Sequence, residues 1–259
     1  MTHSLRIPDL HGRRVLVTGA SSGIGAAVAK GFAQQGARVA VHGFRGVAAA
    51  EVVADEIRAA GGTAAVVVGD LGARGGGAAA VIDAASRLGG IDVLVNNAGN
   101  SFARRKLADL TDADYDEMLD LNLRSMFEAT RAAIPFLRAS SGGCVINTTS
   151  IAARSGGGPG FGLYAVAKAG VSNLTRAFAK ELASDGVRVN AVSPGVIWTR
   201  IHAEHSPPDI MRAMIAAIPM GRIGAVEECI GTYLFLASAM LAGYVTGQII
   251  EVNGGQIMP

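Results

Sequence analysis

Short apolar runs recur along this chain, and longer amphipathic runs separate them. Apolar runs without polar alternation predict strands buried on both faces, as in a parallel sheet covered by helices. The chain is therefore predicted to be an α/β protein with a doubly wound, seven-stranded parallel sheet flanked by helices. The predicted strands are Arg14–Thr18, Arg38–His42, Ala64–Val68, Val93–Asn96, Cys144–Thr148, Arg188–Val192 and Gln248–Glu251. The predicted helices include Val47–Ala60, Gly77–Leu88, Asp112–Ala139, Leu163–Ser184 and Ala225–Ala237.

The first predicted strand runs into a glycine-rich turn, Thr18-Gly19-Ala20-Ser21-Ser22-Gly23-Ile24-Gly25, and a helical pattern follows. Glycines permit positive φ and let a ligand approach the backbone without a Cβ in the way. The helix N-terminus offers unpaired N–H groups and a positive dipole end, which suit a pyrophosphate. The Gly-xxx-Gly-x-Gly spacing differs from the general dinucleotide fingerprint. Taken alone, the segment is therefore also compatible with an ordinary tight turn.

Tyr164 and Lys168 lie four residues apart in a predicted helix, shortly after Ser150. Side chains at this spacing share one helix face. A lysine ammonium beside a phenol favours the phenolate, so we expect the pKa of Tyr164 to fall from about 10 toward working pH. Such a tyrosine can pass a proton to or from an alcohol or carbonyl oxygen. The same pair also occurs on solvated helix faces, so this interpretation depends on the rest of the chain.

With these two elements and further landmarks in the same order, the chain resembles the short-chain dehydrogenase/reductase family of the classical type, from about Leu10 to Gly255. The landmarks are Asp70, Asn96-Asn97-Ala98-Gly99, Asn122, Ser150, Pro194-Gly195, Thr246-Gly247-Gln248 and Val252-Asn253-Gly254-Gly255. The resemblance implies a Rossmann fold forming a single catalytic domain over residues 1–259, with a substrate lid at about 200–220. It implies hydride transfer between NAD(P) and a carbonyl or secondary alcohol, as in a ketone reductase or alcohol dehydrogenase.

The resemblance assigns catalytic roles to four side chains. Tyr164 is the general acid in reduction and the base in oxidation, and Lys168 lowers its pKa and binds the nicotinamide ribose hydroxyls. Ser150 donates a hydrogen bond to the substrate oxygen. Asn122 supports a water chain that links Lys168 to solvent.

Cofactor binding is expected beyond the strand ends. The implied residues are Gly19, Ser21, Ser22, Gly23, Ile24, Gly25, Arg45, Asp70, Leu71, Asn97, Ala98, Gly99, Tyr164, Lys168, Pro194, Gly195, Ile197 and Thr199. The second strand ends without the carboxylate that binds adenosine ribose hydroxyls and repels a 2′-phosphate. Arg45 suits such a phosphate, which favours NADP over NAD, although a solvated loop arginine is the alternative. Against NADP, Ser22 stands where NADP-preferring members often carry a basic residue.

Several positions depart from the family pattern. The interval from Ser150 to Tyr164 is one residue longer than in many members, which leaves Thr149 and Ser155 as lesser alternatives for the hydroxyl. Asn253 replaces the more usual aspartate before the final Gly-Gly, and we interpret that position as structural. Acyl-carrier reductases tend to have basic residues where this chain has Ser141 and Asp185, which counts modestly against an acidic carrier protein as partner.

Composition narrows the class of protein. Half of the 259 residues are hydrophobic and 17% are charged, which suggests surface buried in an oligomer. In the family the long helices pair across one two-fold axis and the C-terminal strand region across a second, which implies a homotetramer. The net charge of +2 does not favour nucleic acid or membrane as partner. The N-terminal residues show no signal-peptide pattern, and the two cysteines have no CxxC partner, so a cytoplasmic protein with reduced thiols is expected. Histidine spacing predicts no metal site.

Two segments are expected to border a small-molecule carbonyl or alcohol substrate. Asp209–Ile218 is read as a lid with a partly apolar inner face, and a surface helix packed on the core is its alternative. The glycine-rich stretch from Ser155 to Gly162 is either a mobile wall of the active site or a plain solvent loop. Two further functions stay open: a non-catalytic NAD(P)-binding regulator, and a dehydratase or epimerase on the same fold.

Overall fold

A computed structural model describes residues 6–102, 104–199 and 208–258 of the chain. Seven strands form one parallel sheet in the order β3-β2-β1-β4-β5-β6-β7, which confirms the predicted doubly wound sheet. The order runs outward in both directions from neighbouring β1 and β4, so the switch point of the topology lies between them. The strands are β1 (Arg14–Val17), β2 (Arg38–Gly43), β3 (Thr63–Val68), β4 (Val93–Asn96), β5 (Cys144–Thr148), β6 (Arg188–Pro194) and β7 (Ile249–Val252).

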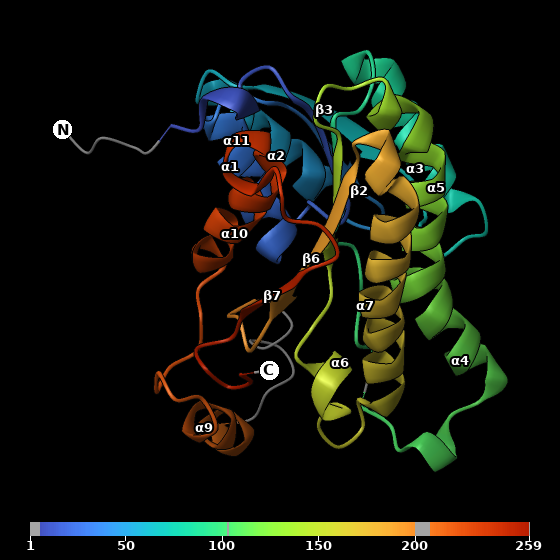
Figure 1. Ribbon diagram of the computed structural model, residues 1–259. Helices are drawn as coiled ribbons and strands as arrows, with labels where there is room; N and C mark the ends of the chain where they lie inside the picture. The colour runs from blue at the N-terminus through green and yellow to red at the C-terminus, as the bar shows by residue number, and fades with distance from the viewer. Residues whose placement is uncertain (1–5, 103, 200–207, 259) are drawn as a thin grey trace.

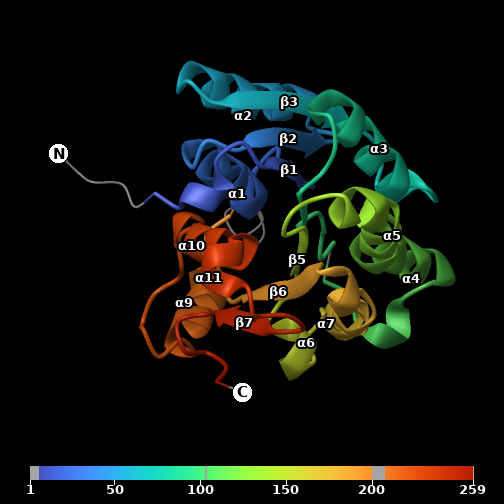
Figure 2. The same cartoon turned by 45° about the horizontal axis from the view of Figure 1, so that its top comes forward.

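Helices cover both faces of this sheet (Figures 1 and 2). One face packs against α1 (Gly23–Gln34), α2 (Val47–Ala59) and α10 (Glu227–Ala237), with α11 (Ala239–Ala242) and η1 (Pro8–Leu10) beside them. The other packs against α3 (Gly76–Leu88), α5 (Ser125–Arg138) and α7 (Gly162–Leu182), and α4 (Asp112–Leu119) continues that layer. The short helices α6 (Ala152–Ser155) and α9 (Pro208–Ala216) lie at one end of the molecule in Figure 1. Two further 3₁₀ turns are η2 (Leu107–Asp109) and η4 (Ala183–Asp185).

The central strands show why the apolar runs do not alternate. Val15 and Val17 of β1 pack into the cluster under α1 and α10, whereas Leu16 packs into the cluster under α3 and α5. All three side chains have no exposed surface. Because both faces of each central strand are buried, apolar residues occupy consecutive positions of the strand and do not alternate with polar ones. Truncating a side chain such as Leu16 to alanine is expected to cost about 2–5 kcal/mol of stability.

Most predicted elements are found within one or two residues of their expected ends, and one is not a single helix. The segment predicted as Asp112–Ala139 is interrupted by a π-helical turn, η3 (Asp120–Arg124), between α4 and α5. Such turns insert one residue into a helix and are frequent at functional sites. Here the turn contains Asn122. Of the segment predicted as a lid, residues 200–207 lie outside the described part of the chain, and α9 forms most of the remainder.

Candidate active site

Many of the predicted site residues lie in segments that follow four strands at the carboxyl end of the sheet. Parallel strands end on the same side, so the segments that follow β1, β4, β5 and β6 converge there. The Thr149 amide donates to the Val192 carbonyl at 2.8 Å. A Cβ placed on Gly19 would lie 2.8 Å from the Ala98 Cα, so the turn after β1 packs directly on the segment after β4.

Tyr164 and Lys168 lie on the first turns of α7, with Lys168 only 3% exposed. The Lys168 Nζ donates to the Thr148 carbonyl at 3.0 Å and lies 5.7 Å from the centroid of the Tyr164 ring. Tyr164 is half-buried and packs against a small apolar cluster that includes Met118, Leu163 and Phe102. The predicted pair therefore faces the sheet edge and not solvent.

The protonation of this pair differs from the expectation for Tyr164. Burial raises the pKa of Tyr164 to about 12, and a hydrogen bond with the Ser150 side chain opposes that rise. Burial also lowers the pKa of Lys168 to about 8. Lys168 does not lower the tyrosine pKa in the protein alone, because its Nζ bonds the Thr148 carbonyl and the apolar surroundings of the phenol dominate. The hydrogen bond does place Ser150 and Tyr164 side by side.

Asn122 lies beside the same pair, and its amide is fully satisfied. Its Oδ1 accepts from the Asn100 amide at 3.1 Å, and its Nδ2 donates to the carbonyls of Asn100 at 2.9 Å and Met118 at 3.0 Å. A Cβ on Gly99 would lie 2.6 Å from the Asn122 Oδ1 and 3.0 Å from the Lys168 Nζ. Glycine at 99 thus lets the segment after β4 pass close to these two side chains.

The turn after β1 has the shape of a pyrophosphate cradle. Gly19 and Gly23 have positive φ, at 62° and 57°. A Cβ on Gly25 would lie 2.4 Å from the Gly19 carbonyl oxygen and 2.5 Å from the Asn97 Nδ2. The N-cap residue Ser22 makes no side-chain capping bond, so the first-turn amides of α1 are not capped by it. Close-packed glycines and an uncapped helix N-terminus fit the phosphates of a dinucleotide.

Two residues that hold this cradle were not among the predicted site residues. The Thr18 Oγ1 accepts from the amides of Asn97 at 2.9 Å and Ala98 at 3.1 Å, which ties β1 to β4. The His42 Nδ1 accepts from the Gly19 amide at 3.2 Å, and its Nε2 lies 3.0 Å from the Gly69 carbonyl oxygen. Burial lowers the pKa of His42, so the ring is neutral with its proton on Nε2. A histidine inside an otherwise apolar strand was the sequence signal for this role.

The other predicted cofactor residues fall into two groups. Thr199 is brought to the cradle, since a Cβ on Gly23 would lie 3.5 Å from its methyl carbon. Asn97 faces the same turn, where its Nδ2 donates to the carbonyls of Thr18 at 3.0 Å and Gly19 at 3.2 Å. The second group has local contacts away from the cradle. Three of its members are apolar: Ile24 is half-buried against the core, Leu71 is buried in the core, and Ile197 is buried beside Gly224. Two are charged and exposed: Asp70 accepts a hydrogen bond from the Gly72 amide, and Arg45 lies beside the Phe44 ring.

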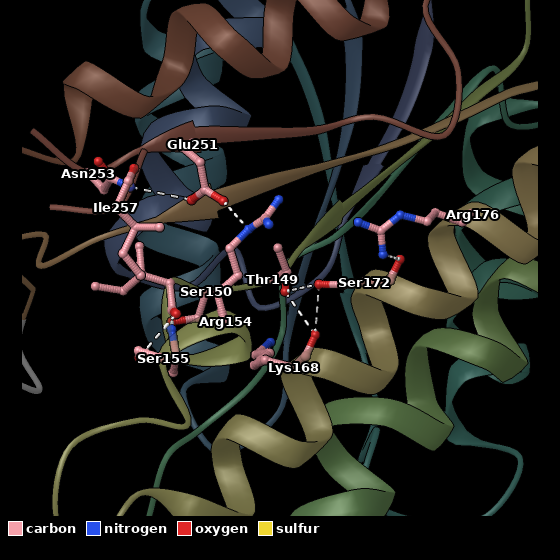
Figure 3. A network of polar contacts seen from close by, with 12 residues as sticks. Thr149, Ser150, Arg154, Ser155, Lys168, Ser172, Arg176, Glu251, Asn253 and Ile257 are labelled. Atoms are coloured by element: carbon pink, nitrogen blue, oxygen red, sulfur yellow. Dashed lines mark hydrogen bonds and ion pairs between the residues drawn. The ribbon is translucent and has the colours of Figure 1, made fainter. Parts of the chain in front are cut away.

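The lesser alternatives for the hydroxyl role are engaged elsewhere (Figure 3). The Thr149 Oγ1 is buried, donates to the Lys168 carbonyl at 2.9 Å and lies 2.7 Å from the Ser172 Oγ. The Ser155 Oγ donates to the Ile151 carbonyl at 3.3 Å. The Ser150 Oγ accepts from the Ala152 amide at 3.1 Å, which leaves its own proton for another acceptor. Ser150 therefore has the geometry that the role requires.

Other site types find no support in the described residues. Cys144 and Cys229 are free and buried, and burial raises the pKa of each thiol to about 11, so neither is a thiolate at neutral pH. Within residues 6–102, 104–199 and 208–258, no group of three metal-ligating side chains comes together. None of the helices in that part of the chain is long and apolar enough to cross a membrane.

Comparisons with known proteins match nearly the whole chain. A family model described as Enoyl-(Acyl carrier protein) reductase matches residues 19–256. A 3-oxoacyl-[acyl-carrier-protein] reductase from Synechocystis sp. is 40% identical over 247 residues, which cover 94% of this chain and 96% of that protein. Among solved structures, the NADH-dependent reductase A1-R′, responsible for alginate metabolism, is 41% identical with a TM-score of 0.89, covering 97% of this chain and 100% of that one. A putative NAD(P)-dependent gluconate 5-dehydrogenase from Beutenbergia cavernae, with bound NADP, is 38% identical with a TM-score of 0.88, covering 95% and 97%.

Proposed function

The chain belongs to the short-chain dehydrogenase/reductase family, and the relatives described above are oxidoreductases of CH–OH and C=O groups. We propose that it reduces a ketone with NADPH. The observation that carries the proposal is the hydrogen bond between Ser150 and Tyr164, with the buried Lys168 ammonium 5.7 Å from the phenol ring. A hydroxyl, an acid and a cation are the groups needed to bind and protonate a carbonyl oxygen.

The residues act on the oxygen of the substrate. The bound nicotinamide supplies the hydride that reduces the carbonyl carbon. The Ser150 hydroxyl donates to the substrate oxygen as negative charge develops there. Tyr164, with a pKa of about 12, is protonated at neutral pH and gives its proton to that oxygen. Lys168, with a pKa of about 8, is mainly charged at neutral pH and stabilises the tyrosinate that remains. These protonation states favour reduction near pH 7. The Lys168 ammonium then returns a proton to the tyrosinate, and Asn122 supports reprotonation of Lys168 from solvent.

The glycine cradle, Thr199 and the Pro194–Gly195 segment would hold the dinucleotide. The end of β2 supports NADP, because Gly43 and Gly46 lie next to Ser21 without a carboxylate among them. Arg45 lies between these two glycines, and its exposed guanidinium, beside the Phe44 ring, would pair with a 2′-phosphate. The relatives divide on this point, since A1-R′ is described as NADH-dependent and the Beutenbergia structure contains NADP. Calorimetric titration decides: tight binding of NADPH that Arg45→Gln weakens supports the proposal, whereas preference for NADH contradicts it.

The described relatives suggest the first substrates to screen. Their descriptions refer to 3-oxoacyl-[acyl-carrier-protein], alginate metabolism and gluconate, so 3-oxoacyl thioesters and keto derivatives of sugar acids form a sensible panel. We place the catalytic unit in one domain over residues 1–259, with a lid at about 200–220, in a cytoplasmic homotetramer. Exposed apolar side chains on α4, α5 and α7, namely Tyr115, Phe127 and Val166, support a helix-paired interface. A monomer mass by light scattering at micromolar concentration would contradict the tetramer.

The proposed activity is tested with Tyr164→Phe. Wild-type protein should oxidise NADPH in the presence of a ketone from this panel, and the variant should lose turnover by about a thousandfold while it still binds NADPH. A native function untouched by this change would favour a regulator. Product formed without net NADPH consumption would favour a dehydratase or epimerase.

A further inference from the structure

Polar contacts connect the C-terminal segment with the turn that carries Ser150 (Figure 3). The Asn253 Nδ2 donates to the Ile257 carbonyl at 2.9 Å and to the Glu251 Oε2 at 3.4 Å. The Arg154 Nε donates to the Glu251 Oε1 at 2.9 Å. The Glu251 side chain is only 12% exposed, so this ion pair is shielded from water on its carboxylate side.

The same two regions also meet through β6. The Ile151 amide donates to the Pro194 carbonyl at 3.1 Å, and the Gly195 amide donates to the Val252 carbonyl at 2.9 Å. A Cβ on Gly195 would lie 2.7 Å from the Asn253 Cβ. The contacts therefore close a ring that contains the Ser150 turn, the Pro194–Gly195 segment and the end of β7.

Arg154 follows the Ser150 turn, which the Thr149 and Ile151 amides join to β6. Arg154 belongs to α6, a four-residue helix that begins just after Ser150. The Ala152 amide of this helix donates to the Ser150 Oγ. A helix of this length is not stable by itself. Gly156 and Gly157 follow it, both with positive φ at 78° and 77°. The ion pair to Glu251 joins this short helix to the sheet.

The ring also gives a reason for Asn253, which departs from the aspartate more usual in the family. Its amide donates to Glu251 and Ile257, and its Oδ1 accepts from the Gly255 amide at 3.0 Å. An aspartate would keep the contact to Gly255, yet it has no proton to donate and would place a second carboxylate beside Glu251. Asparagine therefore suits a position next to a partly buried glutamate.

We propose that Glu251, held by Asn253, is a positioning residue for the reaction: through Arg154 it fixes the Ser150 hydroxyl relative to the Pro194–Gly195 segment. This inference rests on the proposed function, because the catalytic consequence requires Ser150 to bind the substrate oxygen. Small displacements of such a group reduce turnover far more than they reduce stability.

The test uses Glu251→Gln and Arg154→Gln in the full-length protein. Each should lower kcat for ketone reduction about three- to tenfold, with the affinity for NADPH and the unfolding midpoint nearly unchanged. In a Ser150→Ala background the same substitutions should have no further effect on kcat. The double variant Arg154→Glu/Glu251→Arg, which swaps the two charges, should have a higher kcat than either of its single substitutions alone. Arg138→Gln is the matched control, because it removes a comparable arginine–carboxylate pair, with Asp185, that joins α5 to η4.

An unchanged kcat in Glu251→Gln, or an equal loss with and without Ser150, overturns the inference. A second measurement keeps it separate from the proposed function. Amide hydrogen exchange over residues 151–155 should be faster in Glu251→Gln than in the wild type or Arg138→Gln, whatever the substrate. If the protein reduces no ketone, the proposed function fails. If amide exchange at residues 151–155 is unchanged in Glu251→Gln, the positioning role fails, whether or not a ketone is reduced.

Discussion

Asp92 and Arg14 join the two central strands at the end opposite the site. The Asp92 Oδ2 accepts from the Arg14 backbone amide at 2.8 Å and from its Nε at 2.9 Å, while the Oδ1 lies 2.6 Å from the Arg14 Nη2. Burial alone would raise the pKa of Asp92, but the hydrogen bonds from Arg14 outweigh it and hold the pKa at about 2, below the ordinary 3.8. The side chain of Asp92 is 10% exposed, so solvent screens this interaction only weakly.

The change to test is Asp92→Asn. One pKa unit corresponds to about 1.4 kcal/mol, so lowering the pKa from 3.8 to about 2 stabilises the fold by about 2 kcal/mol at neutral pH. Because the folded pKa is depressed, this contribution is complete above the ordinary pKa and is lost as pH falls through the folded value. The variant should therefore be about 2 kcal/mol less stable than the wild type at pH 7, with the difference falling to roughly half near pH 3.

Urea unfolding followed by far-ultraviolet circular dichroism at several pH values measures this difference. Asp185→Asn is the control, because Asp185 pairs with the half-exposed Arg138 and its loss should cost less than about 1 kcal/mol. A loss at Asp92 no larger than that of the control, or one that does not change with pH, would refute the reasoning.

Three further outcomes are expected. Gly99→Ala should lower kcat by about tenfold or more, because its Cβ would lie 2.6 Å from the Asn122 Oδ1 and 3.0 Å from the Lys168 Nζ; Gly231→Ala, which meets no atom within 4 Å, should be neutral in the same steady-state assay. The rate of ketone reduction, measured as kcat/KM, should fall as pH rises through about 8, because Lys168 loses its charge there, and Lys168→Arg should move that limb to higher pH. Asn253→Asp should lower the urea midpoint in the wild type and lower it less when Glu251 is glutamine, since the repulsion between carboxylates is then absent.

The sheet was predictable because burial on both faces gives each strand a run of consecutive apolar residues, which is visible in the sequence. Leu16 is as apolar as Val15 and Val17, although they face opposite layers. The π turn at Asn122 was not predictable in this way, since the helical pattern of the sequence continues from α4 into α5. Only the contacts to Asn100 and Met118 show why the helix deviates there.

The candidate site was predictable in its residue types but not in its electrostatics. Spacing places Tyr164 and Lys168 on one helix face, yet the tyrosine pKa depends on burial against Met118 and Phe102, which are distant in sequence. The roles of Thr18 and His42 likewise depend on strand register, which brings His42 to the Gly19 amide and Thr18 to the segment after β4. These contacts depend on which strands become neighbours in the assembled sheet, and those strands are distant in sequence.

The central claim is that this site transfers a hydride to a carbonyl carbon while Tyr164 protonates the oxygen. NADPH deuterated at the transferred position of the nicotinamide, mixed with protein and a ketone that it turns over, tests the claim most directly. Mass spectrometry of the product should find one deuterium at the carbinol carbon per NADPH oxidised, with the label and the turnover both lost in Tyr164→Phe. Product without deuterium, or labelled product formed equally well by Tyr164→Phe, would contradict the account.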